Sequence, residues 1–279
     1  MAHEFWKVTP GGNPTILLKA EDIAPEKRVP VANAVMDAQH IGGEQVGYVR
    51  LEGRPRLDMM GGEFCLNATR AFASVLDSLG LLGREGDASS GLVEVSGADG
   101  PVEVRVTHGS SALPFVEACL HFSELPAPEP LSDRLCLVRV PGITHIVQYG
   151  ESPALTELEH FCAEQRHGLQ LLDEEAVGHL WLGGSPPDAG ASAPCLSLSP
   201  VVWVRETASL CFESACGSGT LACALAEHAK SGATGFSIVQ PSGTPLSVRM
   251  QRGAAGWDVW VGGPSRITAH GMTDLTGIL

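Results

Sequence analysis

The sequence predicts an α+β protein made of two similar halves. The pattern Cys-x3-Thr-x-Ala occurs twice, from Cys65 and from Cys216, and each copy heads a segment whose apolar residues recur at helical spacing. Between the copies lies 125–130, where Pro126, Pro128 and Pro130 rule out a helix or a central strand. We place the domain boundary there, which gives an N-terminal domain over 1–124 and a C-terminal domain over 125–265.

Short apolar runs and alternating segments predict the remaining elements. Strands are expected at 5–8, 15–18, 44–50, 91–95, 102–106, 115–120, 135–140, 146–149, 201–205, 209–212, 236–240, 246–250, 257–261 and 266–269. Helices are expected at 30–40, after Cys65 as far as Gly80, at 156–167, at 171–182 and from Thr220 to Lys230. Each half therefore combines strands with a helix that a cysteine heads.

Composition excludes several classes of protein. The 279 residues are 44% hydrophobic, which is typical of a globular chain, and the net charge of −14 argues against a nucleic-acid surface or an anionic membrane as partner. No run of 18 apolar residues occurs, and no basic segment followed by an apolar core opens the chain, so we expect a cytoplasmic protein. The eight cysteines form no Cys-x-x-Cys pair, which argues against a metal site; most of them, Cys223 included, are expected to be small core residues.

The corner at Cys216 suits an anionic ligand. Gly217, Ser218 and Gly219 let backbone N–H groups approach a ligand, and the N-terminus of a helix carries partial positive charge. A thiol placed there is expected to have a lowered pKa. A buried cysteine that caps a core helix would give the same pattern, whereas a phosphate loop would need a Gly-x4-Gly-Lys motif that is missing. The second copy at Cys65 favours two thiols that face one cleft.

Three further polar residues are candidates for a site, and each has a structural alternative. Asn13, between two strands, is either a turn residue or a ligand for a charged group. Glu44, together with Gln45, follows a glycine pair and is either a solvated strand start or part of a small-ligand site. His145 follows a glycine turn at a strand start, where a lone histidine is usually structural.

Taken together, these motifs resemble the diaminopimelate epimerase superfamily of cofactor-independent racemases and epimerases. The resemblance runs nearly end to end and rests on Gly12-Asn13, Glu44-Gln45, Cys65-x-Asn67-Ala68-x-Arg70, Gly142-x-x-His145, and Glu213 ahead of Cys216-Gly217-Ser218-Gly219. It implies two pseudo-symmetric domains, each a mostly antiparallel β half-barrel around a central helix, with the active site in the cleft between them. It also implies that residues 266–279 return to the first domain and that the protein forms a homodimer.

The resemblance implies a two-base reaction at the Cα of an amino acid, without cofactor or metal. Cys65 and Cys216 would act on opposite faces of that carbon, because inversion needs a base on each side. Backbone N–H groups after each cysteine would hold the α-carboxylate, and the α-ammonium would be held by acidic or imidazole side chains. The residues implied for binding are Leu66, Asn67, Gly217, Ser218 and Gly219 for the carboxylate; Glu44, His145 and Glu213 for the ammonium and for thiol protonation; and Asn13 for orientation.

Departures from the epimerase pattern bear on the substrate. In the epimerase pattern, three segments bind the second amino-acid end of the substrate. The approximately corresponding segments here are Asp58-Met59-Met60-Gly61, Gly142-Ile143-Thr144-His145 and Arg205-Glu206-Thr207-Ala208. A distal zwitterion without partners would bind poorly. The segments around Glu44 and Cys65 look more like the histidine racemases of opine metallophore biosynthesis. The alternatives are diaminopimelate epimerase itself, a racemase of another polar amino acid, and a non-catalytic amino-acid-binding protein; the related phenazine-type isomerases use an acidic residue instead and fit less well.

Overall fold

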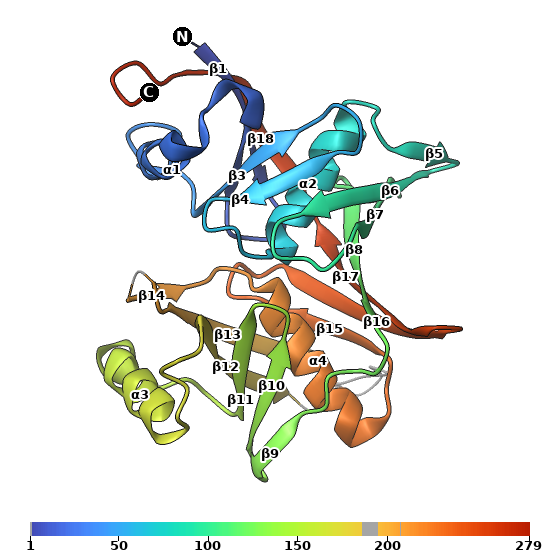
Figure 1. Cartoon of the computed structure of the whole chain (residues 1–279). Coiled ribbons are helices and arrows are strands. Elements are labelled where there is room, and N and C mark those ends of the chain that lie inside the picture. The colour runs from blue at the N-terminus through green and yellow to red at the C-terminus, as the bar shows by residue number, and fades with distance from the viewer. Residues whose placement is uncertain (1, 186–194, 207) are drawn as a thin grey trace. The chain divides into compact units, whose positions relative to one another are not determined.

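The structure is a computed structural model that describes residues 2–185, 195–206 and 208–279. The chain divides into two units (Figure 1): unit 1 comprises Met1–Leu120 and Trp260–Leu279, and unit 2 comprises His121–Val259. The chain therefore passes from unit 1 to unit 2 after residue 120 and returns to unit 1 after residue 259. The sequence predicted these two boundaries after residues 124 and 265. In the described part of the chain there are four α-helices, and most strand pairs are antiparallel.

Unit 1 is a strongly twisted set of strands with one helix in its interior. Its strands are β1 (Ala2–Thr9), β2 (Thr15–Lys19), β3 (Gln45–Arg50), β4 (Arg56–Met59), β5 (Gly83–Glu85), β6 (Ala88–Val95), β7 (Val102–Thr107), β8 (Phe115–Phe122, as far as Leu120) and β18 (Arg266–Asp274). Strand β1 pairs antiparallel with both β2 and β18, while β2 pairs parallel with β3. Strands β6, β7 and β8 form an antiparallel meander. Two short 3-10 turns, Ala20–Asp22 and Pro25–Lys27, lead into α1 (Arg28–Met36).

Helix α2 (Leu66–Ser78) is the interior helix of unit 1, and every residue from Leu66 to Leu76 is buried. Alanines, Phe72 and Val75 allow this burial, but Arg70 also lies there with no exposed surface. Its guanidinium donates to the carbonyl oxygens of Val116 (2.9 Å), Pro10 (3.1 Å) and Pro264 (3.4 Å). Burial lowers the pKa of Arg70 to about 10, so the side chain stays charged at neutral pH. Arg70 therefore ties the helix to three chain segments of the same unit.

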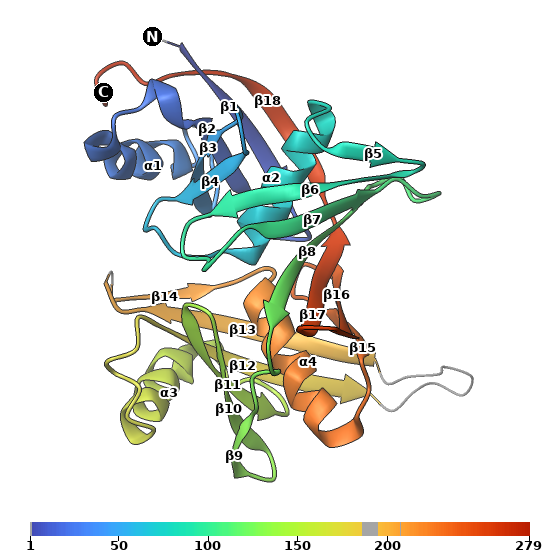
Figure 2. The same ribbon diagram turned by 45° about the vertical axis from the view of Figure 1, so that its right-hand side comes forward.

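Unit 2 has helices on opposite faces of its sheet. Its strands are β9 (Glu129–Ser132), β10 (Leu135–Val140), β11 (Ile143–Tyr149), β12 (Ala176–Ser185), β13 (Cys195–Val204), β14 (Ser209–Phe212), β15 (Gly235–Val239), β16 (Pro245–Gly253) and β17 (Gly256–Pro264, as far as Val259). Helix α3 (Leu155–Gly168) packs through Leu158 and Cys162 on Trp181 of β12. Gly219 of helix α4 (Gly217–Ser231) lies against Leu180, the residue of β12 that precedes Trp181. Both helices are labelled in Figure 2.

The helix predicted at 171–182 is wrong, because residues 176–185 form strand β12 between β11 and β13. Successive side chains of a strand point to opposite faces, and here helices cover both faces, so the residues from Val177 to Leu182 are all buried. Such a continuous apolar run lacks the alternation that identifies a strand. The helix predicted at 30–40 ends early, at Met36, where the Asp37 carboxylate accepts the N–H of Gln39 at 2.7 Å and favours a turn.

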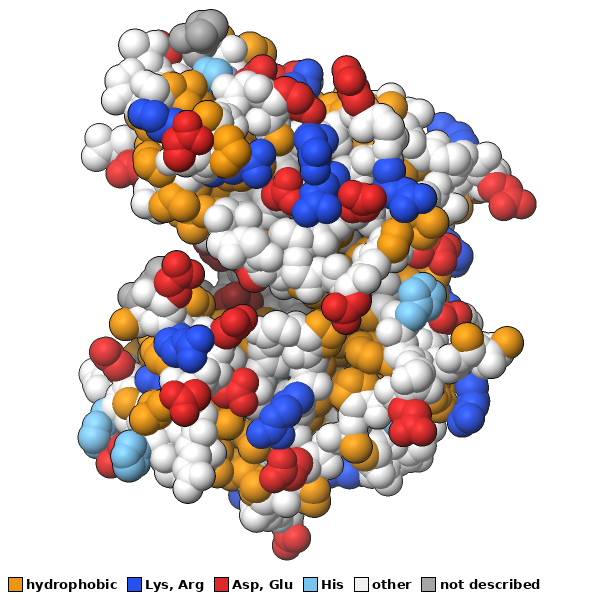
Figure 3. Space-filling model, in the orientation of Figure 1, with side chains coloured by type: hydrophobic (Ala, Val, Ile, Leu, Met, Phe, Trp, Pro, Cys, Tyr) orange, Lys and Arg blue, Asp and Glu red, His pale blue; other side chains and the backbone are white. Residues whose placement is uncertain are grey.

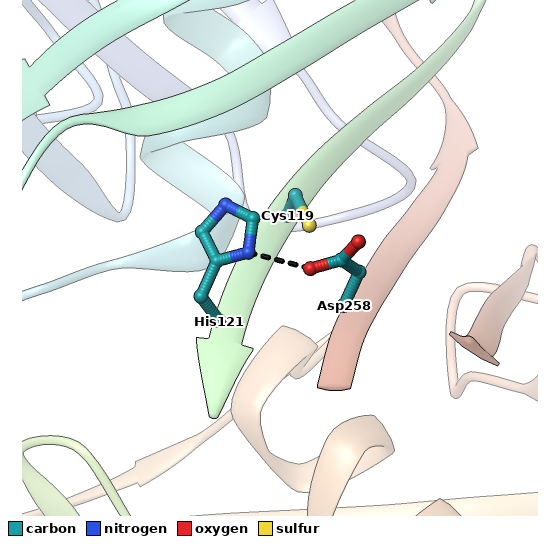
Figure 4. Close-up of side chains that lie close together, drawn as sticks. All are labelled: Cys119, His121 and Asp258. Atoms are coloured by element: carbon teal, nitrogen blue, oxygen red, sulfur yellow. Dashed lines mark hydrogen bonds and ion pairs between the residues drawn. The ribbon is translucent and has the colours of Figure 1, made fainter. Parts of the chain in front are cut away.

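The boundary strand β8 carries His121 into unit 2. The Nδ1 of His121 lies 2.7 Å from Oδ1 of Asp258 on β17, within the same unit (Figure 4). Cys119, two residues earlier on β8, belongs to unit 1. The His121–Asp258 pair thus joins the first and last segments of unit 2.

Charged side chains are interspersed on the surface. On the face that Figure 3 shows, basic and acidic groups of unit 1 lie beside one another, and Asp58, for example, pairs with Arg56 at 2.7 Å. On this face, the acidic and basic side chains are mixed and form no broad basic area, which agrees with the net charge of −14. Each described helix is too short or too polar to cross a lipid bilayer.

Candidate active site

Each of the two repeated cysteines is the N-cap residue of a helix. Cys65 precedes α2 with φ −130° and ψ 111°, and Cys216 precedes α4 with φ −124° and ψ 106°. The sulfur of Cys65 accepts the N–H of Ala68 at 3.4 Å, and that of Cys216 accepts the N–H of Gly219 at 3.2 Å. Both sulfurs therefore take up one of the N–H groups that a helix start leaves unpaired. This confirms that each cysteine heads a helix, although α4 begins at Gly217 rather than at Thr220.

The threonine of the repeated motif holds the same turn from the other side. Thr69 donates through Oγ1 to the carbonyl of Cys65 at 2.8 Å, and Thr220 donates to the carbonyl of Cys216 at 2.6 Å. A hydroxyl four residues into a helix reaches back to the carbonyl one turn earlier. The spacing Cys-x3-Thr is thus explained: sulfur and hydroxyl together fix the backbone on which the thiol is mounted.

In unit 1, a chain of hydrogen bonds leads from the loop at Asn13 to the thiol of Cys65. Thr15 Oγ1 donates to the Asn13 carbonyl at 3.2 Å, Gln45 Nε2 donates to Thr15 Oγ1 at 2.6 Å, and Cys65 Sγ donates to Gln45 Oε1 at 3.2 Å. Thr15 and Gln45 face each other because β2 and β3 are parallel neighbours with these residues in register. The structure therefore brings two of the predicted site residues, Asn13 and Cys65, into one network.

The other predicted residues of unit 1 lie along the same elements. Asn13 is buried and has a positive φ of 46°, a conformation that asparagine tolerates better than most residues. The N–H of Glu44 donates to the carbonyl of Pro14 at 2.8 Å, and partial burial raises the pKa of the Glu44 carboxyl. Leu66 and Asn67 are buried in the first turn of α2, directly after the thiol.

In unit 2, Cys216 is almost completely buried, with 3% of its surface exposed. Burial raises the pKa of its thiol well above the ordinary value, and the carboxyl of Glu213 raises it further. Hydrogen bonds with Ser218 and with the N–H of Gly219 act in the opposite direction but are smaller influences. The expectation of a lowered pKa is therefore wrong for Cys216, because desolvation outweighs the helix N-terminus. The thiol of Cys216 is therefore protonated at neutral pH.

Gln240, which sequence analysis missed, fixes the backbone of Cys216. Its Oε1 accepts the N–H of Cys216 at 3.0 Å, and its Nε2 donates to Thr220 Oγ1 and to the Ile238 carbonyl, both at 3.0 Å. Only 2% of Gln240 is exposed. A lone glutamine at the end of a predicted strand gives no sign of such a role, since Thr220 and Cys216 are 20 and 24 residues away.

His145 is the third residue of β11, which begins at Ile143, and it lies in the interior of unit 2. It is wholly buried on β11, between β10 and β12, and its ring covers Gly178, where an added Cβ would come within 2.0 Å of Nδ1. Within the described residues, neither ring nitrogen has a hydrogen-bond partner. Burial, aided by His179, lowers the pKa of His145 to about 3. The imidazole is therefore neutral at physiological pH.

The family model and the related sequences that match this chain carry the same name. The model of the histidine racemase CntK N-terminal domain matches residues 2–273. A histidine racemase of Fusobacterium nucleatum subsp. nucleatum is 29% identical over 280 residues, which cover 96% of this chain and 95% of that protein. A histidine racemase of Staphylococcus aureus is 25% identical over 292 residues, covering 96% of each.

Solved structures with this fold are more distant in sequence. A hydroxyproline epimerase from Agrobacterium vitis, with bound trans-4-hydroxy-L-proline, superposes with a TM-score of 0.64 at 10% identity, over 98% of this chain and 91% of the other. A phenazine biosynthesis PhzF family protein from Enterococcus faecalis gives a TM-score of 0.61 at 16% identity, over 99% and 100%. These two matches establish the fold alone. Because the family model extends over nearly the whole sequence, the chain belongs to the histidine racemase CntK family.

Proposed function

We propose that this protein interconverts L- and D-histidine by a two-base reaction in which Cys65 and Cys216 act on opposite faces of Cα. The observation that supports this most is the matched N-cap geometry of the two cysteines, since a helix start presents each sulfur beside backbone N–H groups. The family membership supports the same reaction. We further propose that units 1 and 2 are pseudo-symmetric half-barrels, each around its cysteine helix, and that the substrate binds in a cleft between them.

In the proposed reaction, one cysteine thiolate takes the α-proton, and the electron pair of the broken C–H bond stays on Cα and its carboxylate. The other cysteine then delivers its S–H proton to the opposite face, so the enzyme ends the turnover with the two protonation states exchanged. Glu213 disfavours the thiolate of Cys216. We therefore assign the first proton abstraction in the resting enzyme to Cys65 and the proton delivery to Cys216.

The carboxylate carries the charge that develops in this reaction. We propose that the N–H groups of the first helical turns hold it, aided by the helix dipoles. These groups belong to Leu66, Asn67, Gly217, Ser218 and Gly219. Glu44 and Glu213 are assigned to the α-ammonium and Asn13 to orientation. His145 stays in this set as a neutral group, whose imidazole has one nitrogen that accepts and one that donates a hydrogen bond.

Histidine is favoured over diaminopimelate by the surroundings of Asp58. This residue stands near the place where the epimerase pattern has an amide for the distal end of its substrate. Here its carboxylate is 2.7 Å from Arg56 Nε and 3.7 Å from Arg28 Nη1. A carboxylate engaged in these ion pairs is not available to a second ammonium group.

The test is a panel of single enantiomers incubated with the purified protein and followed by chiral chromatography. We expect L-histidine and D-histidine each to approach an equal mixture, with diaminopimelate isomers and other polar amino acids converted at least about a hundredfold more slowly, the discrimination that a few misplaced polar contacts provide. Conversion of diaminopimelate alone would overturn the substrate assignment. No Cα–H exchange in heavy water with any amino acid would favour the non-catalytic alternative.

We also propose that the protein works as a cytoplasmic homodimer in metallophore biosynthesis, without cofactor. These proposals rest on the family resemblance. Sedimentation velocity of the purified protein is expected to give a mass of about twice that of the 29.2 kDa chain. A single species with the mass of one chain at micromolar concentration would contradict the dimer.

A further inference from the structure

Gln45 bridges a strand hydroxyl and the thiol of Cys65. Its Oε1 accepts from Cys65 Sγ at 3.2 Å, and its Nε2 donates to Thr15 Oγ1 at 2.6 Å. Thr15 and Gln45 are register partners on β2 and β3, so the backbone sets the distance between their side chains. In the sequence, Gln45 stood out only as the neighbour of Glu44.

The direction of the Gln45 amide follows from Thr15. The Thr15 hydroxyl gives its one proton to the carbonyl of Asn13 at 3.2 Å, and a carbonyl oxygen can only accept. Toward Gln45 the hydroxyl can therefore only accept, which turns the NH2 group of the amide to Thr15 and its oxygen to the sulfur. Thr15 has no exposed surface, so solvent does not compete for this hydroxyl. The amide oxygen accepts an S–H proton but has no proton to offer a thiolate.

Two opposing influences therefore meet at Cys65. The N–H of Ala68, in the first turn of α2, donates to the sulfur and favours the thiolate. The oxygen of Gln45 favours the protonated thiol. In unit 2 the glutamine has another place, because Gln240 holds the backbone N–H of Cys216, while the thiol itself contacts Ser218 and Glu213.

We propose that Gln45, oriented by Thr15, is a positioning residue that holds the proton of Cys65 and so sets the balance between its thiol and thiolate forms. The inference rests on the proposed two-cysteine reaction, in which Cys65 must pass between these forms in every turnover. The oxygen of Gln45 favours the thiol form of Cys65, whereas the helix start favours the thiolate form. Thr15 keeps the amide from turning its NH2 group to the sulfur.

The matched pair Thr15→Val and Thr15→Ser tests this orientation. The rate at which iodoacetamide alkylates Cys65 is measured from pH 5 to 10 in a Cys216→Ser background, by mass spectrometry of the peptide that contains Cys65. Valine removes the acceptor, so the amide turns its NH2 group to the sulfur, and we expect alkylation near pH 7 to be about fivefold faster, the effect of one hydrogen bond. Serine keeps the hydroxyl and is expected to give the profile of the parent protein.

Gln45→Glu changes the same contact in the opposite sense. A carboxylate beside the sulfur repels the thiolate, so alkylation near pH 7 is expected to slow by a similar factor and its profile to move to higher pH. Thermal melting of every variant shows whether it is folded, and a folded Gln45→Glu protein suffices for the test if Thr15→Val does not fold. A Gln45→Glu profile like that of the parent, or equal profiles for the two Thr15 variants, would overturn the proposal.

Alkylation does not depend on catalysis, which separates this inference from the proposed function. A protein that racemises histidine but shows no effect of Thr15→Val on alkylation would overturn the role of Gln45 alone. A protein that shows the predicted alkylation profiles but racemises no amino acid would overturn the proposed function alone.

Discussion

Replacing either Cys65 or Cys216 by alanine is expected to lower histidine racemisation by at least about a thousandfold in both directions. The proposed reaction needs one group to remove the α-proton and another to return a proton on the opposite face, and a positioned acid or base contributes on the order of 10² to 10⁴ in rate. Each cysteine is also an N-cap, whose loss destabilises a helix by about 1 kcal/mol. Serine variants keep an N-cap acceptor and separate loss of chemistry from loss of folding.

Exchange of the substrate Cα–H for deuterium resolves the two bases. An enzyme with one cysteine left can remove and return the proton on one face only, so one enantiomer is expected to exchange without inversion. Because burial and Glu213 raise the pKa of Cys216, the Cys65→Ala enzyme, which has only Cys216, is expected to exchange more slowly at pH 7 than the Cys216→Ala enzyme.

Cys223 provides the matched control for these substitutions. It lies on α4, seven residues after Cys216, is fully buried, and has a pKa raised by burial. Cys223→Ala is expected to racemise at the parental rate. Full racemisation by either the Cys65→Ala or the Cys216→Ala protein would contradict the two-base reaction.

The sequence predicted the elements that carry their own local signals. The two cysteine helices were predictable because the N-cap sulfur, the threonine at the fourth position and the alanines all lie within a few residues of one another. Gly232, a glycine just beyond the segment predicted as the second helix, is the C-cap residue of α4 with a φ of 72°. Strands with one exposed face, such as β7, show the alternation that the sequence displays.

What escaped prediction depends on contacts between distant segments. The sequence of strand β12 shows no alternation of apolar and polar residues, because helices cover both of its faces. Gln240 accepts the N–H of Cys216 although the two residues are 24 positions apart. The pKa of Cys216 could not be read from the helix start, because its burial depends on how the whole unit packs. The sequence thus placed a cysteine at the head of each helix and named Glu213, while Gln240 and the burial that raises the pKa of Cys216 became visible only in the fold.

Acidification is expected to destabilise unit 2 because two histidines are buried in neutral form. Burial lowers the pKa of His145 and of His179 from 6.5 to about 3. His179 Nδ1 lies 2.8 Å from Gln165 Oε1, and its Nε2 lies 3.1 Å from the Arg166 guanidinium. A guanidinium can only donate, so Nε2 must be the unprotonated, accepting nitrogen. Protonation of His179 would break this bond and place two positive charges together, which Arg166, 8% exposed, cannot relieve through solvent.

The folded pKa values lie below the unfolded value, so the unfolded chain binds more protons between pH 6.5 and 3. The contribution to stability is therefore complete above pH 6.5 and is lost as pH falls toward 3, with a slope approaching about 1.4 kcal/mol per pH unit for each imidazole. By pH 4, each histidine is expected to have removed roughly 3 kcal/mol from the free energy of unfolding. Carboxylates contribute to acid unfolding as well, so the comparison must be between variants.

Urea unfolding of the parent and of His179→Gln at pH 7, 6, 5 and 4 isolates this effect. Glutamine removes the titration while keeping a donor for Gln165 and an acceptor for Arg166. The variant is expected to be less stable than the parent at pH 7, because the shape of glutamine fits less well. It is expected to lose less stability on acidification, so the free energies of unfolding of the two proteins converge toward pH 4. His160→Gln, at an exposed position of α3, is the control for replacing a histidine by glutamine as such. Parallel curves for the parent and His179→Gln would show that His179 is not held neutral by the fold.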